Sequence, residues 1–122
     1  MRFTQDSNSP AQLIRAYQPG EIRINDAVHR ETVIVSASIV LAVPEIRSMD
    51  ELEAIDPSRI LALDPELVLL GTGQRQIFPA STFRARFLSA GIGFEVMDTG
   101  AACRTFNVLV AEQRRVVALL LV

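Results

Sequence analysis

Residues 65–73, with the sequence PELVLLGTG, and residues 97–107, with the sequence MDTGAACRTFN, decide the fold. Each has the pattern of a buried strand that stops at a glycine-containing turn, and the second turn opens a helix. The apolar run at residues 67–70 favours a central strand covered on both faces. In an open α/β sheet, turns at the carboxyl ends of strands line the crevice where ligands bind. The sequence therefore predicts where a site lies without specifying a reaction.

Strand and helix patterns alternate through the second half of the chain. After the strand that begins at Leu67, we expect a helix at 80–90, a strand at 92–97, a helix at 99–112 and a strand at 115–122. This alternation predicts parallel strand pairing with right-handed crossovers. An α/β fold follows for this part of the chain.

The first half of the chain has a different pattern. Extended segments are expected near residues 13–17, 21–25, 28–36 and 39–43, which together predict an N-terminal antiparallel β meander. Composition predicts that residues 1–12 are a polar, flexible lead-in and that residues 13–122 form a single α/β domain.

Two short helices are expected between the meander and the central strand. Ser48 and Glu51 have the spacing of a capping box, in which each side chain reaches the other residue's backbone amide. The first helix should continue to about residue 55. Asp56 and Pro57 then suit the N-cap and first position of a second helix that ends near residue 63.

Composition excludes several classes of function. The 122 residues are 49% hydrophobic and 21% charged, which predicts a compact domain. The net charge of −2 argues against a nucleic-acid partner, because phosphate-binding surfaces are basic. The apolar run at 116–122 is shorter than the roughly 20 residues that a membrane span needs, so we expect no spanning helix. The polar N-terminus lacks the apolar core of a signal peptide, which predicts a cytoplasmic location.

Catalytic and metal-binding equipment is sparse in the sequence. The chain has one cysteine, Cys103, and one histidine, His29. A structural zinc site usually needs four such ligands, and a Ser-His-Asp relay would have to use His29, far along the chain from the glycine turns. We therefore expect no metal, no cofactor, no catalytic residues and no enzymatic activity.

The first candidate site is the turn formed by Gly71, Thr72, Gly73 and Gln74. Its two glycines allow close backbone approach to a ligand, and their amides could form an anion-binding concavity. The alternative is a tight turn that needs a positive φ angle. A dinucleotide fingerprint is rejected, because position 76 is glutamine where a third glycine is required.

The second candidate site is the start of the last helix. Asp98 or Thr99 can accept hydrogen bonds from its first amides, or the helix dipole could attract an anion there. Asn107 shares a helix face with Cys103 and Arg104, so a polar edge toward the crevice is expected. Cys103 is either a nucleophile or, as is commoner, a buried inert thiol.

The motifs resemble a known family. The central strand and glycine turn at 65–73, together with 96–99, 102–105, 107–109, Glu112 and Arg115, resemble the small domain of mitochondrial complex I (NADH dehydrogenase) assembly factor three and its uncharacterised bacterial and archaeal relatives. The resemblance implies a three-layer α/β/α fold around a mixed, mainly parallel sheet. It also implies a non-catalytic role in assembling a respiratory complex, and it carries over no catalytic residue.

Three functional hypotheses follow. The first is a non-enzymatic interaction module with a protein partner, which assists assembly of a complex I-like respiratory complex in a prokaryote. The second is a binding protein for a small ligand (an anion or a nucleotide), or a weak enzyme, that uses the crevice between the two turns. The third is a homodimer, suggested by the surplus of apolar residues. The candidate binding residues are Gly71, Thr72, Gly73, Gln74, Asp98, Thr99, Cys103, Arg104, Thr105 and Asn107.

Overall fold

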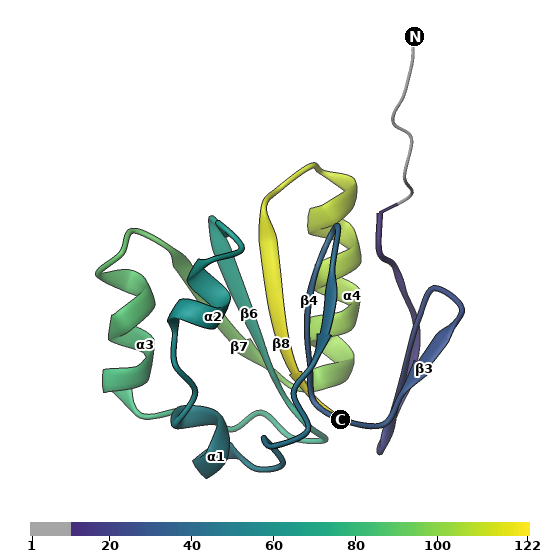
Figure 1. Ribbon diagram of the computed structural model, residues 1–122, viewed down its shortest axis with the longest axis horizontal. Coiled ribbons are helices and arrows are strands. Elements are labelled where there is room, and N and C mark those ends of the chain that lie inside the picture. The colour runs from purple at the N-terminus through teal and green to yellow at the C-terminus, as the bar shows by residue number, and fades with distance from the viewer. Residues whose placement is uncertain (1–10) are drawn as a thin grey trace, which may run out of the picture.

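The computed structural model describes residues 11–122 and has a mixed α/β fold with two sheets (Figure 1). Most of the lead-in expected at 1–12 lies outside the described residues. The strands are β1 (Ile14–Gln18), β2 (Glu21–Ile24), β3 (Ala27–His29), β4 (Val33–Ser36), β5 (Val40–Ala42), β6 (Leu67–Thr72), β7 (Gly93–Met97) and β8 (Val116–Leu121). The helices are α1 (Met49–Glu53), α2 (Ser58–Leu61), α3 (Ser81–Leu88) and α4 (Thr99–Ala111).

The larger sheet has the strand order β5-β4-β8-β6-β7. Strand β6 pairs in parallel with both of its neighbours, so that Leu70 lies opposite Leu119 of β8 and Val96 of β7. The strand and helix order predicted after Leu67 is confirmed, and β6 is apolar because it is central. Strand β4, however, is antiparallel to both β8 and β5. The sheet is therefore mixed, with parallel pairing confined to β6 and its two neighbours.

The smaller sheet is an antiparallel meander of β1, β2 and β3 only. The predicted strand at 28–36 is wrong, because the chain leaves one sheet after His29 and enters the other at Val33. Burial explains the break. Val28 is 44% exposed at the edge of the small sheet, whereas Val33 is fully buried in β4. The expected meander thus ends early, and β4 and β5 extend the larger sheet instead.

Two apolar clusters lie on opposite faces of the larger sheet, because side chains alternate along each strand. In β6, Val68 and Leu70 join the cluster that includes residues of α1 and α3, whereas Leu69 joins the one that includes residues of α4. The α4 cluster also contains Ile14 and Ile22 of the small sheet. The larger sheet is therefore covered by helices on one side, and by α4 together with the small sheet on the other (Figure 1).

The expected capping box at the start of α1 is only half correct. The Ser48 hydroxyl accepts from the Glu51 amide at 3.3 Å, as expected. The Glu51 carboxylate accepts from the Arg47 amide at 2.7 Å, one residue before the predicted partner. Both bonds still satisfy amides at the helix N-terminus, so the helix begins where the sequence predicts.

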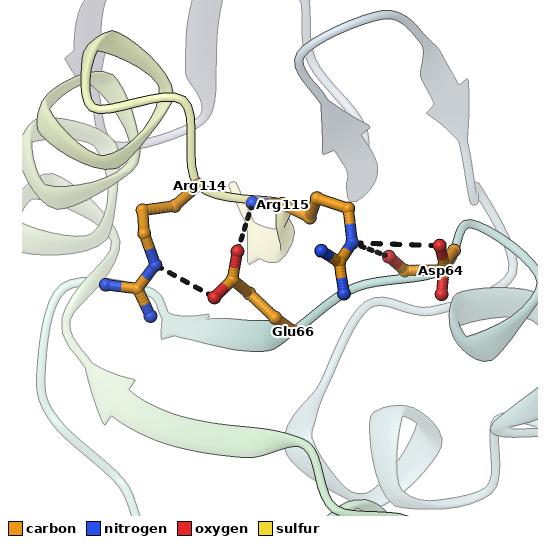
Figure 2. A network of polar contacts seen from close by, with 4 residues as sticks. All are labelled: Asp64, Glu66, Arg114 and Arg115. Atoms are coloured by element: carbon orange, nitrogen blue, oxygen red, sulfur yellow. Dashed lines mark hydrogen bonds and ion pairs between the residues drawn. The ribbon is translucent and has the colours of Figure 1, made fainter.

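A polar network ties the start of β6 to the start of β8 (Figure 2). The Glu66 carboxylate accepts from the Arg115 amide at 2.9 Å and from Arg114 Nε at 3.0 Å, and these two bonds lower the pKa of Glu66. Arg115 Nε also donates to the Asp64 carbonyl at 3.1 Å. The network fixes the end of the sheet opposite to the two glycine-containing turns.

Candidate functional site

The two predicted turns meet at one end of the larger sheet, beyond the carboxyl ends of β6 and β7, where Thr99 joins them. The Thr99 amide donates to the Gly73 carbonyl at 2.8 Å, and the Gly73 amide donates to the Thr99 hydroxyl at 2.8 Å. The same hydroxyl donates to the carbonyl of Leu121 at the end of β8. Thr99 has no exposed surface. One buried threonine therefore connects the ends of β6 and β8 to the start of α4.

Close packing fills the crevice that was expected between the turns. A Cβ atom at Gly71 would lie 2.9 Å from Leu120 Cδ2 and 3.1 Å from Thr99 Cα. Glycine is therefore required here for contact between β6 and α4, and not for approach to a ligand. Thr72 is also buried. The two turns contact each other here, so no open crevice separates Gly71 from Thr99, whereas Thr72, Gly73 and Gln74 line a separate hollow of about 320 Å³ together with Arg47 and Arg75.

The rest of the first turn supports the alternative that Gly71–Gln74 forms a tight turn and not a ligand site. Gly73 has a φ of +92°, which glycine adopts at no steric cost. The Thr72 hydroxyl accepts from the Ile77 amide and donates to the Arg75 carbonyl, so it organises the loop that follows β6. Gln74 is exposed at the start of that loop. The glycine-turn amides are thus not presented together toward solvent as an anion site, since that of Gly73 is bonded to Thr99.

The start of α4 is capped by its own sequence. The Asp98 carboxylate accepts from the Ala101 amide at 2.9 Å, as expected of an N-cap residue. Capping by Asp98 places a negative charge where an anion would otherwise bind. The geometry therefore favours the capping interpretation of Asp98.

Asn107 has a structural role that the sequence did not reveal. Its Oδ1 accepts from the Ile14 amide at 2.9 Å, and its Nδ2 donates to the Ile14 carbonyl at 2.8 Å. The side chain thus pairs with β1 as a neighbouring strand would. It fastens the small sheet to α4 across 93 residues of sequence. The sequence signal is an amide side chain among the apolar residues of this helix, but the partner strand cannot be inferred from it.

A hollow of about 170 Å³ lies between β1 and α4. Three of the predicted residues, Cys103, Arg104 and Asn107, line it, and Thr105 does not. Strand β1 supplies the other wall, including Tyr17. The Tyr17 hydroxyl is buried and has no hydrogen-bond partner among residues 11–122. Sequence reasoning missed Tyr17, since nothing local to β1 indicates that it faces the start of α4.

The chemistry of this hollow is set by burial. Cys103 is 5% exposed, and burial raises the pKa of its thiol to about 12. Arg104 lowers this pKa, but by less than burial raises it. Burial also raises the pKa of Tyr17, and the nearby Cys103 and Asp98 raise it further. At neutral pH both groups are protonated and uncharged, so Cys103 is a poor nucleophile in the folded protein.

No cluster of three or more histidine, cysteine, aspartate or glutamate side chains suited to a metal ion occurs within residues 11–122. In the same range, no helix combines the length and the hydropathy that crossing a bilayer requires.

Comparison with known families and structures gives consistent matches. A family model described as a protein of unknown function (DUF498/DUF598) matches residues 14–121. The "13 kDa major membrane protein" of Francisella tularensis subsp. holarctica is 31% identical over 119 residues, which cover 95% of each chain. The NMR structure of a Xanthomonas campestris protein is 33% identical, with a TM-score of 0.86, and the match covers 100% of this chain and 92% of that one.

A third relative bears on location. The crystal structure described as an outer membrane protein from Bartonella henselae is 34% identical, with a TM-score of 0.77, and the match covers 91% of this chain and 94% of that one. The Francisella and Bartonella names both refer to membranes. The expected cytoplasmic location is therefore wrong. That expectation rested on the polar N-terminus and the short apolar run, neither of which reports on attachment to a membrane surface.

Replacement of Asn107 by alanine tests its structural role. The Ile14 amide and carbonyl would both lose their partner, so Asn107→Ala is expected to lower the free energy of unfolding by about 1–3 kcal/mol. Chemical denaturation measures this change. Val108→Ala is the control, because Val108 is the next residue and is 56% exposed. An Asn107→Ala variant as stable as the control would contradict the role of Asn107 in holding β1.

The Cys103 thiol provides a test that depends on pH. The folded thiol keeps its proton to about pH 12, whereas an unperturbed thiol loses it near 9.0. Between these values the unfolded state binds fewer protons, so the contribution of Cys103 makes stability fall as the pH rises. Denaturation at pH values below and above 9.0 should show a steeper fall for the wild type than for Cys103→Ala. If the stability of the wild type and of Cys103→Ala falls equally as the pH rises, and the native thiol is rapidly alkylated, the argument that Cys103 is buried would be contradicted.

Proposed function

The chain belongs to the DUF498/DUF598 family of proteins of unknown function, and we propose that it is a non-enzymatic interaction module that works at a membrane surface. One observation carries the proposal. Ile77 and Phe78 are adjacent in the loop after β6, and they are 41% and 66% exposed. Phe78 is the most exposed of the large apolar side chains in residues 11–122. Adjacent apolar side chains held in water are a feature of contact surfaces.

The membrane part of the proposal draws on two relatives. The Francisella and Bartonella proteins are named as membrane proteins, and each match covers more than nine tenths of both chains. Because no helix within residues 11–122 is suited to spanning a bilayer, attachment from the surface is the mode that these residues favour. The module would then act as a peripheral protein.

Assistance with assembly of a complex I-like respiratory complex is the specific role that we propose. Its support is the resemblance of the 65–73 and 97–107 motifs to the assembly-factor family. The structure offers a physical reason for the similarity of these motifs: they contain Gly71, Gly73 and Thr99, which join β6 to α4. The motifs therefore support a shared fold, and the assembly role is the function extended from that likeness.

The non-enzymatic part of the proposal is supported by the state of the candidate residues. The thiol of Cys103 is protonated at neutral pH, and the amide of Asn107 is engaged with the backbone of β1. Neither group is free to attack or bind a substrate. Asp98 is likewise engaged as the cap of α4.

One observation favours the alternative of a small-ligand site. The hollow of about 170 Å³ between β1 and α4 contains a buried tyrosine hydroxyl with no described partner. A small polar ligand could bond to Tyr17 there, beside the Arg104 guanidinium. This alternative differs from the predicted one in position, since β1 forms the wall and the glycine turn does not.

The proposed function is tested in the organism that carries the gene. After cell breakage, the chain is expected in the membrane pellet and is expected to be released by alkaline carbonate, as a peripheral protein is. Deletion of the gene is expected to lower membrane NADH:quinone oxidoreductase activity, and a plasmid copy should restore it.

The outcomes separate the parts of the proposal. A chain found only in the soluble fraction would contradict the membrane part. Unchanged oxidoreductase activity in the deletion strain would contradict the assembly role. Stabilisation of the purified chain by a small anion or nucleotide, lost in Tyr17→Phe, would favour the ligand alternative.

A further inference from the structure

We infer that the loop at 74–80 inserts its tip, Ile77 and Phe78, into the interface of a membrane that carries anionic lipid. The inference deepens the proposed membrane function and rests on it. It assigns the contact to one loop and identifies the lipid surface itself as the partner.

The loop is fastened to the fold at several points. The Thr72 hydroxyl accepts a hydrogen bond from the Ile77 amide at 3.0 Å, and Gln76 Nε2 donates to the Val96 carbonyl of β7 at 3.0 Å. At the far end, the Ala80 amide donates to the Glu53 carboxylate of α1 at 2.8 Å. The tip is therefore bracketed by bonds to β6, β7 and α1. A loop that is already ordered in this way loses little further conformational entropy on binding.

The apolar side chains of the tip are not part of the aromatic cluster in the core. Phe83, Phe87 and Phe94 form a contact cluster with ring centroids 5.1–5.9 Å apart. Phe78 precedes Phe83 by five residues in the chain but lies outside this cluster and is 66% exposed. The bonds on either side of Phe78 thus hold an aromatic ring in water, where its transfer to an apolar phase is favourable.

The charges beside the tip suit an anionic surface. Arg75 and Arg47 are both exposed, and with Ile77 they line a hollow of about 320 Å³ next to the tip. Neither arginine forms an ion pair with a residue of the described range. The neighbouring Glu51 and Glu53 carboxylates are bonded to backbone amides. A hydrogen bond from an amide does not cancel the charge of a carboxylate, so the attraction to lipid phosphates rests on the two exposed guanidinium groups, which have no ion-pair partner in the described residues.

The small size of the tip favours lipid over a protein partner. A standard protein interface buries about 1,600 Å² over many residues of both partners. Two apolar side chains and an adjacent arginine cover far less. A bilayer interface accepts such a protrusion, because apolar groups sink below the headgroups while the basic group stays at the surface.

The test is co-sedimentation of the full chain with vesicles of phosphatidylcholine mixed with phosphatidylglycerol, and with vesicles of phosphatidylcholine alone. The wild type should bind the mixed vesicles more tightly. Phe78→Ser should weaken binding roughly tenfold, as expected for loss of most of one inserted side chain. Arg75→Gln should weaken binding to the mixed vesicles roughly fivefold and have little effect on phosphatidylcholine alone.

Matched controls are available on other elements. Val108→Ser removes a side chain that is 56% exposed on α4, and Arg23→Gln removes an exposed charge on β2. Both controls should bind like the wild type, and thermal unfolding should show that all four variants are folded.

Three results would overturn the inference. Equal binding by Phe78→Ser and the wild type would mean that another surface makes the contact, and the proposed membrane function would survive. A wild type that binds no vesicles, yet sediments with native membranes, would identify a protein partner in place of lipid. Equal binding to both kinds of vesicle, unaffected by Arg75→Gln, would remove the anionic requirement.

Discussion

The buried hydroxyl of Thr99 is the contact on which the end of the sheet at the carboxyl ends of β6 and β8 depends. It accepts from the Gly73 amide at 2.8 Å and donates to the Leu121 carbonyl at 2.6 Å, so a single side chain joins the ends of the adjacent strands β6 and β8. Because Thr99 is also the first residue of α4, which Asp98 caps, the same contact fixes the start of that helix against the sheet. A buried hydroxyl that uses both its donor and an acceptor position specifies one arrangement, since either partner left unpaired would be costly.

The surrounding structure follows from this junction. Gly71 allows α4 to lie against β6, and α4 then presents Asn107 to β1, which holds the small sheet. On the other side, Thr72 fixes the loop that carries the exposed tip. Positions of the two motifs thus have separate roles: Gly71 and Thr99 close the fold, and Thr72, next to Gly71, arranges a surface loop. The most recognisable part of the sequence therefore maintains structure, while the exposed surface with interaction chemistry lies just after it.

The sequence predicted the half of the fold in which local pattern and tertiary structure agree. The β6–β8 region was foreseen because apolar runs, helix faces and caps such as Asp98 all indicate the same elements. The first half was less predictable. Whether Val28 and Val33 share a strand depends on which sheet each joins, and that is decided by long-range pairing with β2 and β8. The meeting of the two glycine-containing turns was predicted, but whether a crevice lies open between them depends on packing that residue spacing does not report. Tyr17 and Asn107 show the limit, because they line one hollow from two segments about ninety residues apart.

The account rests on the claim that the motif at 97–107 serves to close the fold. The most direct measurement is the free energy of unfolding of Thr99→Val, which keeps the shape of the side chain and removes its hydroxyl. The Gly73 amide and the Leu121 carbonyl would both lose their partner, so we expect a loss of about 2–4 kcal/mol. Thr105→Val, at a half-buried position of the same helix, should change stability by less than 1 kcal/mol, roughly the helix-propensity difference. A Thr99→Val protein as stable as this control would contradict the claim and return Thr99 to the list of candidate binding residues.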